Sequence, residues 1–266
     1  MDLGIRDRVA IVCAASRGLG KAAAAGLARE GARVVLCSRE QARLESAASE
    51  IRAAAGSDAA VLACLADLSR DADIVRLVDT AVQHFGRLDI LINNAGGPPV
   101  GTFPGLDDGA WQQGVELTLL STIRCIRAVL PHMLRQRWGR IVNITSIAAR
   151  QPVNDLIISS TLRPGILGLS KILANQYGRE GILVNCVTPG FILTDRQKEI
   201  SASRAATRGI PVEQYIAELS GEIPLQRLGR PEELADVIVF LASERAGYVT
   251  GAAIGVDGGL SKGLLS

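Results

Sequence analysis

The sequence predicts a doubly wound α/β fold, in which a parallel seven-stranded sheet carries helices on both faces within one domain, residues 1–266. Short aliphatic runs alternate with longer helical patterns along the whole chain. The runs are apolar throughout, as is typical of strands that are covered on both faces. No repeat or low-complexity linker interrupts this order, and 266 residues suit one large domain.

Seven short runs of β-branched and aliphatic residues are the expected strands. Parallel strands need crossover segments of a dozen or more residues, and most stretches between the runs are long enough to supply them. In chain order the runs are RVAIVC (8–13), RVVLCS (33–38), AAVLACL (59–65), LDILINN (88–94), GRIVNITS (139–146), GILVNCVTP (181–189) and AAIGVDGG (252–259).

Helices are predicted in the crossovers at 19–30, 41–55, 71–85, 111–136 and 232–241, with another after residue 163. Segment 195–220 differs, because it is polar and charged and follows the end of a strand. Ligands bind beyond the carboxyl ends of the strands in such sheets, so this segment is expected to be a substrate lid.

Composition excludes several classes of function. The net charge is +2, from 29 Lys and Arg against 27 Asp and Glu, which argues against nucleic acid as a partner. The start of the chain does not resemble a signal peptide, and no uninterrupted apolar run is long enough to span a membrane. Five scattered cysteines without a CxxC pair and only two histidines indicate a cytoplasmic protein with no metal site.

A glycine-containing turn after the first strand is the first candidate binding feature. In CAASRGLG, Gly18 and Gly20 open a helix, where the backbone can approach a pyrophosphate and the helix amino end offers unpaired N–H groups. Small residues also occur at such turns for packing alone, so this signal is weak by itself. It predicts a dinucleotide site of the Rossmann type when other residues agree with it.

Residues at the end of the second strand favour NADP(H) over NAD(H). A carboxylate usually holds the ribose hydroxyls of a cofactor that has no 2′-phosphate, and Cys37, Ser38 and Arg39 occupy this position. Arg39 and Arg17 are suited to pair with a 2′-phosphate, and Ser38 to donate to it. The alternative is that both arginines are solvated surface charges.

Five motifs in order resemble the short-chain dehydrogenase/reductase family over nearly the whole chain, in particular its members of the 3-oxoacyl-acyl-carrier-protein reductase type. They are the glycine turn, Asp67-Leu68, NNAG at 93–96, Pro189-Gly190 with Thr194, and the final strand. The resemblance implies these cofactor-binding residues: Ser16, Arg17, Gly18, Leu19, Gly20, Ser38, Arg39, Asp67, Leu68, Asn94, Ala95, Gly96, Arg163, Pro189, Gly190, Ile192 and Thr194.

The family's chemistry uses a Tyr as proton donor, a Lys four residues later, a Ser that polarises the carbonyl and an Asn in the proton relay. Here the Ser matches Ser146, but the family's spacing places Ser159 and Arg163 at the Tyr and Lys positions and Thr118 at the Asn position. We take Ser146, Ser159, Arg163 and Thr118 as the candidate catalytic set. The other tyrosines, Tyr177, Tyr215 and Tyr248, are expected to pack or to lie in the lid.

These substitutions change what the site can do. An alkyl hydroxyl is a far weaker acid than a phenol, and Ser159 is too short to reach the same point without a water molecule. Arg163 is expected to act as a fixed charge, because a guanidinium normally has a pKa above about 12. Pro164 disfavours helical geometry at Arg163, so we expect the helix to begin near residue 163 or 164, or to be kinked there.

Three functions remain open from the sequence. The first is an NADP(H)-dependent reductase of a carbonyl, or dehydrogenase of a secondary alcohol, with a water molecule that delivers the proton. The second is a cofactor-binding protein of this fold with little or no activity. The third is a non-redox enzyme for an anionic or thioester-linked substrate, drawing on a set of arginines and lysines at the site and lid: Arg150, Arg163, Arg196, Lys198, Arg204 and Arg208.

The partners that we expect are a small-molecule carbonyl or alcohol substrate and other copies of the chain, with neither nucleic acid nor a membrane. The resemblance implies a homotetramer or homodimer that is formed through two long helices, 118–136 and the one after Arg163.

Overall fold

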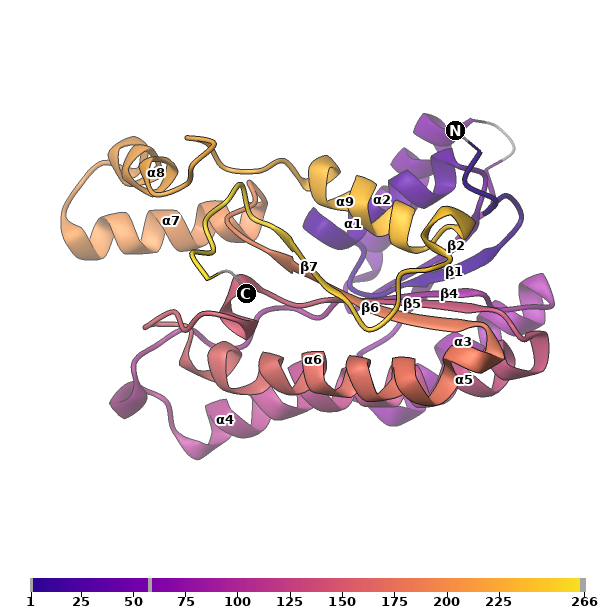
Figure 1. The fold of residues 1–266 in the computed structure, drawn as a ribbon. Coiled ribbons are helices and arrows are strands. Elements are labelled where there is room, and N and C mark those ends of the chain that lie inside the picture. The colour runs from indigo at the N-terminus through magenta and orange to yellow at the C-terminus, as the bar shows by residue number, and fades with distance from the viewer. Residues whose placement is uncertain (1, 57–58, 264–266) are drawn as a thin grey trace.

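The computed structural model describes residues 2–56 and 59–263 and contains the predicted parallel sheet (Figure 1). All pairings between neighbouring strands are parallel, and the spatial order is β3-β2-β1-β4-β5-β6-β7. The strands are β1 (Val9–Val12), β2 (Arg33–Ser38), β3 (Val61–Leu65), β4 (Ile90–Asn93), β5 (Gly139–Ile144), β6 (Ile182–Pro189) and β7 (Ala253–Val256). The doubly wound fold class is confirmed.

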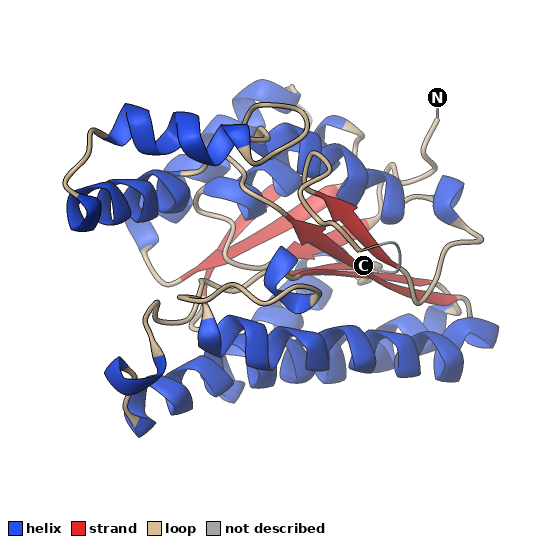
Figure 2. Cartoon of the chain, turned by 60° about the vertical axis from the view of Figure 1, so that its left-hand side comes forward, coloured by secondary structure: helices blue, strands red, loops and turns tan. Residues whose placement is uncertain are grey.

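Helices cover both faces of this sheet (Figures 1 and 2). One face carries α1 (Gly18–Arg29), α2 (Gln41–Ala55) and α9 (Pro231–Leu241). The other carries α3 (Asp71–Phe85), α5 (Ser121–Gln136) and α6 (Ile157–Tyr177). The short α4 (Asp108–Gly114) precedes a π-helical turn, Val115–Leu120, that leads into α5.

The strand sequence explains the two layers. Ala10 and Val12 of β1 face the first core, whereas Val9 and Ile11 face the second, so every side chain of β1 is buried on one side or the other. Burying an aliphatic side chain contributes about 1.5–3 kcal/mol, which is why apolar runs without alternation form the central strands.

The helix that carries the candidate catalytic residues differs from the prediction. We expected it to begin near Arg163 or Pro164, or to kink there, and this is wrong, because α6 is continuous from Ile157 to Tyr177 (Figure 1). Pro164 lies on the exposed face of α6, so water can solvate the Ser160 carbonyl that loses its intrahelical donor. The opposite face is buried, and this packing outweighs the cost of the proline.

The stretch 108–136, from α4 to the end of α5, is long and apolar enough to cross a membrane by length and composition alone. Buried residues of α5, including Cys125, Ile126, Val129 and Met133, pack in the core between this helix and the sheet. A core helix passes the same test of length and composition, and the expectation of no membrane partner stays a prediction.

The predicted lid is a pair of helices that projects beyond the sheet (Figure 1). It consists of α7 (Asp195–Arg208) and α8 (Val212–Gly221), which pack through Ala205, Tyr215 and Leu219. Arg204 ties the pair to the loop before α6 by an ion pair of 2.5 Å with Asp155.

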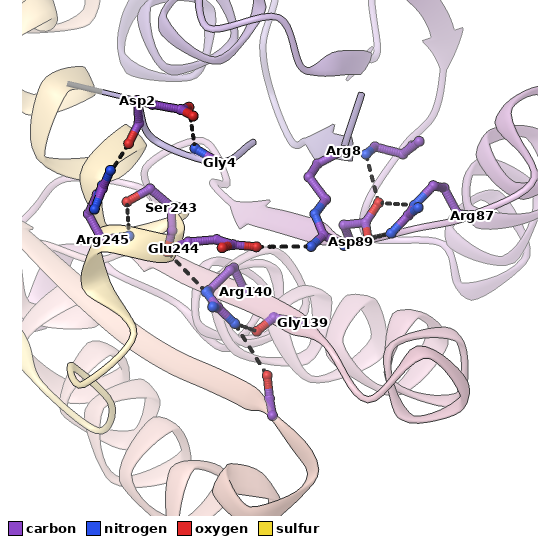
Figure 3. Close-up of polar contacts among 12 residues, drawn as sticks. Asp2, Gly4, Arg8, Arg87, Asp89, Gly139, Arg140, Ser243, Glu244 and Arg245 are labelled. Atoms are coloured by element: carbon purple, nitrogen blue, oxygen red, sulfur yellow. Dashed lines mark hydrogen bonds and ion pairs between the residues drawn. The ribbon is translucent and has the colours of Figure 1, made fainter. Parts of the chain in front are cut away.

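A polar network closes the opposite end of the sheet, at the amino ends of β1, β4 and β5 (Figure 3). The fully buried Asp89 accepts hydrogen bonds from Arg8 at 3.2 Å, from the Val9 amide at 2.9 Å and from both Nε and Nη2 of Arg87 at 2.7 and 2.6 Å. Arg8 and Arg140 lie on the Trp138 ring, 3.9 and 4.1 Å from its centroid.

Candidate functional site

Two adjacent cavities lie at the carboxyl ends of the strands, where the fold predicts a ligand site. The larger, of about 490 Å³, extends along the ends of β1, β2 and β3. The smaller, of about 190 Å³, lies between the loop after β4, the start of α6 and the lid. Leu19, Gly97, Thr145, Arg163, Thr194 and Arg196 line both, so the two cavities share a wall.

The glycine turn forms one end of the larger cavity. Gly18 has a positive φ of 58°. Gly20 lies outside the cavity wall, and a Cβ there would come within 2.5 Å of the Ala14 carbonyl oxygen and 2.9 Å of Asn94 Nδ2. Gly20 therefore allows the start of α1 to pack against the loops after β1 and β4, which sets the shape of the turn.

Ala14 is strained in the same turn. The family that the chain resembles has the first glycine of its TGxxxGxG turn at this position, and Ala14 adopts a left-handed conformation there, with φ of 47°. A residue with a Cβ loses about 1–2 kcal/mol in this region, so the substitution leaves the turn in place at some cost in stability.

The end of β2 presents cations to the larger cavity. Arg17, Arg39 and Arg43 line it, together with Ser38 and Glu40. Glu40 pairs with Arg43 at 3.1 Å, and Arg17 pairs with Glu199 of the lid at 3.0 Å. Arg39 is exposed and has no ion-pair partner in residues 2–56 and 59–263.

The remaining predicted cofactor-binding residues also lie on these walls. Those on the larger cavity are Ser16, Leu19, Asp67, Leu68, Asn94, Ala95, Gly96 and Thr194, and those on the smaller are Pro189, Gly190 and Ile192. Thr194 caps α7 by accepting a hydrogen bond from the Gln197 amide at 3.2 Å. The structure thus brings residues from four of the five motifs, and from the end of β2, to one pair of cavities, whereas the final strand lines neither of them.

The candidate catalytic residues Ser146 and Ser159 both line the smaller cavity. Ser146 accepts a hydrogen bond from the Ala148 amide at 3.1 Å and so caps a short 3₁₀ turn, which leaves its hydroxyl proton available for a ligand. Ser159 is 4% exposed on the buried face of α6, and its hydroxyl has no hydrogen-bond partner in the described part of the chain.

Arg163 lies one turn after Ser159 on α6 and is 8% exposed. Its Nη1 donates to the carbonyls of Ile144 and Thr145 at 3.2 and 2.7 Å, whereas Nε is buried with no partner. No carboxylate pairs with this guanidinium in residues 2–56 and 59–263. Burial lowers the pKa of Arg163 to about 10, which is below the value that the sequence led us to expect but leaves the group charged at neutral pH.

Thr118 lies behind the cavities, not on their walls. It sits in the π-helical turn before α5, where its hydroxyl is buried and has no partner among the described residues. Irregular turns of this kind often occur at functional positions. The structure therefore does not place Thr118 in direct contact with a ligand in either cavity.

No tyrosine lines either cavity in the described part of the chain. Tyr215 is buried inside the lid, where its hydroxyl accepts a hydrogen bond from Arg204 at 3.3 Å, and Tyr177 packs in the core beneath the sheet. Tyr248 is fully exposed. The site thus holds no replacement phenol.

The arginines and lysines that the third candidate function would use for an anionic substrate do not lie together in the structure. Arg150 donates to the Ala253 carbonyl of β7 and lines neither cavity, so its expected position at the cavity mouth is wrong. Arg208 pairs with Glu218 at 2.7 Å, and Arg204 with Asp155. Of the lid cations, Arg196 alone among the described residues lines a cavity, and it lines both.

The sequence did not identify every residue of the walls. Gly97 directly follows NNAG, and Thr145 directly precedes Ser146, so proximity to these motifs was a usable signal. Other wall residues also lie within or directly beside predicted ones, namely Ala14, Glu40, Ala66, Leu117 and Asp195. Wall residues without such a neighbour are Arg43, Ile144, Pro98, Val100, Leu156, Gln197 and Ile200. Among the described residues, no group of three or more His, Cys, Asp or Glu side chains is placed to hold a metal ion.

The chain is similar to known reductases over almost its full length. Residues 13–261 match the family described as Enoyl-(Acyl carrier protein) reductase. The 3-oxoacyl-[acyl-carrier-protein] reductase of Synechocystis sp. is 36% identical over 255 residues, which are 95% of this chain and 96% of that protein. The (2S)-[(R)-hydroxy(phenyl)methyl]succinyl-CoA dehydrogenase subunit BbsD of Thauera aromatica is 34% identical over 259 residues, 97% of this chain and 98% of that protein.

Solved structures show the same likeness. L-sorbose reductase from Gluconobacter frateurii, complexed with NADPH and L-sorbose, superimposes with a TM-score of 0.94 at 35% identity, covering 99% of this chain and 100% of that one. The shared fold, the shared cavity position and the matched motifs agree with one another. The chain therefore belongs to the short-chain dehydrogenase/reductase family.

Proposed function

We propose that the protein is an NADPH-dependent carbonyl reductase in which Arg163 stabilises the reacting oxygen and bound water supplies the proton. The observation that carries the proposal is the placement of Arg163. Its guanidinium is buried, lacks a carboxylate partner among the described residues, and lies in the wall between the larger and the smaller cavity.

The larger cavity fits NADPH. The amino end of α1 and the glycine turn suit the pyrophosphate, and Arg39 is an unpaired guanidinium for the 2′-phosphate at the end of β2. The L-sorbose reductase to which this chain is similar is complexed with NADPH, which supports the same choice. When bound, NADPH supplies the hydride that adds to the carbonyl carbon and becomes NADP⁺.

Ser146 and Arg163 act on the carbonyl oxygen. As the carbonyl π bond breaks, negative charge develops on this oxygen, and donors that are already fixed in place stabilise it without reorganising. Ser146 offers its hydroxyl proton, and Arg163 offers a charge that its two backbone acceptors hold in position. Burial strengthens this electrostatic effect, because little water screens the guanidinium.

The proton needs a route because neither Ser159 nor Arg163 is a ready donor at neutral pH. The oxyanion takes a proton from a water molecule, which leaves hydroxide to be neutralised by solvent. Ser159, with a free hydroxyl in the smaller cavity, holds this water, and Thr118 behind the wall is a second buried hydroxyl that a water molecule can satisfy. Positioned proton transfer typically contributes 10²–10⁴-fold, so we expect slower turnover than with a phenol.

The first experiment separates binding from turnover. Titration of NADPH followed by its fluorescence should show saturable binding, and NADPH oxidation should then be measured with ketones, diketones, ketoses and a 3-oxoacyl thioester. Ser146→Ala should lower kcat by about 10²-fold, as is typical of the loss of one oxyanion donor, with the affinity for NADPH unchanged. Thr161→Ala, on the exposed face of α6, is the matched control and should leave kcat unchanged.

The outcomes distinguish the candidate functions. Absence of NADPH binding would exclude a reductase and an inactive cofactor-binding protein alike. Binding without oxidation of NADPH by any carbonyl would favour the inactive cofactor-binding protein. Full activity of Ser146→Ala would exclude the proposed oxyanion site while leaving a reductase intact.

A further inference from the structure

Arg196 is a guanidinium that no other described side chain or carbonyl binds, and it lies over the smaller cavity. It comes from the first turn of α7 and reaches the loop after β4, where a Cβ on Gly97 would lie 3.9 Å from its Nη2 and 4.0 Å from its Nε. The Arg196 side chain thus extends from the lid to the opposite wall, at the mouth of both cavities.

The acids nearest to Arg196 on its own helix are already paired. Asp195 lies 3.9 Å from Lys198, and Glu199, three residues after Arg196, lies 3.0 Å from Arg17. Opposite charges three residues apart on a helix can pair with each other, but Glu199 contacts Arg17 instead, which leaves Arg196 available to a ligand.

The smaller cavity has a one-sided charge. Two guanidinium groups, Arg163 and Arg196, line it, and no Asp or Glu in the described part of the chain does. Arg163 is buried and has an unpartnered Nε, while Arg196 is exposed to solvent. A cleft lined by one sign of charge concentrates ligands of the opposite sign, and a guanidinium binds a carboxylate through two parallel hydrogen bonds.

We propose that the substrate is a small ketone that carries a carboxylate, bound at its carboxylate by Arg196 and at its carbonyl oxygen by Arg163 and Ser146. This inference names the substrate class and rests on the proposed reductase function. The volume is about 190 Å³, and bound NADPH would fill the part next to Pro189, Gly190 and Ile192, so what is left suits a short molecule. Apolar wall residues suit its alkyl part: Pro98, Val100, Leu156 and Ile200. The carbonyl takes a hydride at carbon and a proton from water at oxygen, and the carboxylate does not react.

The test compares acids with their neutral esters. The substrates are 2-oxobutanoate, 3-oxobutanoate and 4-oxopentanoate, each with its methyl ester, at saturating NADPH. We expect kcat/KM of the wild-type enzyme for at least one acid to exceed that of its ester at least tenfold. The series also identifies the spacing between the carboxylate and the carbonyl that the two arginines accept.

Arg196→Gln should abolish this preference by raising KM for the acid about 10- to 100-fold, which is the effect expected when a charge-assisted pair is lost. The KM for the ester and for NADPH should stay within about twofold. Lys198→Gln removes a cation two residues away that lines neither cavity, and it should keep the preference. Wild-type preference for the esters, or a preference that survives in Arg196→Gln, would overturn the proposal.

Two further results decide the remaining cases. If Arg196→Gln raises KM for NADPH and not for the acids, Arg196 binds the cofactor and the proposal is wrong. If no carbonyl is reduced at all, calorimetric titration of butanoate against butanamide, with NADP⁺ present, tests the anion site without turnover. Binding of butanoate that Arg196→Gln removes supports the site, whereas no binding to the wild-type protein overturns it.

Discussion

At the scale of single residues, the position of a proton donor is occupied by side chains with other chemistry. Ser159 and Arg163 have the spacing of the family's Tyr and Lys and share a buried face of α6. At these positions a group that is charged at neutral pH would stand for the family's lysine, and a hydroxyl that cannot release its proton near neutral pH would stand for its phenol. We therefore propose that the site retains charge stabilisation and lacks proton donation by a side chain.

The preference for NADPH should depend on Arg39. Arg39→Ala should weaken NADPH binding about 10- to 100-fold and leave NADH binding within about twofold, because a guanidinium–phosphate pair contributes about 1.5–3 kcal/mol and NADH has no 2′-phosphate. Fluorescence titration of both cofactors measures this difference. Arg52→Ala is the control, since Arg52 is a cation of the same helix, α2, that lines neither cavity. An equal loss of affinity for both cofactors would show that Arg39 stabilises the conformation of the loop after β2 and does not bind the 2′-phosphate.

The dependence of the rate on pH should report the charge of Arg163. Burial lowers the pKa of Arg163 to about 10, so the cation is present through pH 9 and is lost as the pH rises through 10. We expect kcat of the wild-type enzyme to fall in this range. In Arg163→Lys the fall should begin at lower pH, because an exposed lysine has a pKa of about 10.4 and burial lowers it further. The same profile for both enzymes would contradict a role of this charge.

At the scale of elements, the continuity of α6 decides whether the family's catalytic geometry can be restored. Pro164 would have separated Ser159 from Arg163 if the helix began late, but both lie on its buried face, one turn apart. The preference of the residue before proline for extended angles is a local effect. Packing along the 21 residues of α6 exceeds it.

The double substitution Ser159→Tyr with Arg163→Lys should therefore raise reductase activity. We expect kcat for a simple diketone to rise at least tenfold, since positioned general acid catalysis commonly contributes 10²–10⁴-fold. Ser159→Phe with Arg163→Lys has nearly the same shape without the acidic hydroxyl and is the control. Steady-state NADPH oxidation measures both. No gain, in a variant that still binds NADPH, would show that the cavity has no room for a phenol.

Elements that local burial patterns fix could be predicted from the sequence, whereas features that depend on contacts between distant segments could not. Apolar runs predicted the strands within a few residues, and α2 and α3 have the predicted bounds, because the burial of periodic side chains fixes them. The π-helical turn at Val115–Leu120 and the ion pair of Arg17 with Glu199 depend on contacts between distant segments, which local patterns do not contain. The motifs lie along the chain and so indicated which loops line the larger cavity, whereas only the structure shows that no described group binds Arg196.

At the scale of the whole molecule, the candidate ligand cavities and a buried network of charged side chains lie at opposite ends of the sheet. The cavities lie at the carboxyl ends of the strands, and the network around Asp89 lies at their amino ends (Figure 3). Loops at the carboxyl ends can vary with the substrate because the amino ends hold the strands together. Assembly into a dimer or tetramer through α5 and α6, and a cytoplasmic location, stay predictions.

Asp89→Asn should consequently lower stability without changing the site. The fully buried Asp89 carboxylate is paired with two arginines. Its neutralisation removes the anion that Arg87 contacts and one of the two that Arg8 contacts, and it weakens the buried hydrogen bonds, so we expect a loss of about 1–3 kcal/mol in the free energy of unfolding. Urea unfolding measures this loss, and NADPH titration of the folded variant should give the wild-type affinity. Asp7→Asn removes an exposed carboxylate that pairs with Arg33 and should cost less than about 1 kcal/mol. If Asp89→Asn altered NADPH affinity while the protein stayed folded, the two ends of the sheet would be coupled through β1 and β4.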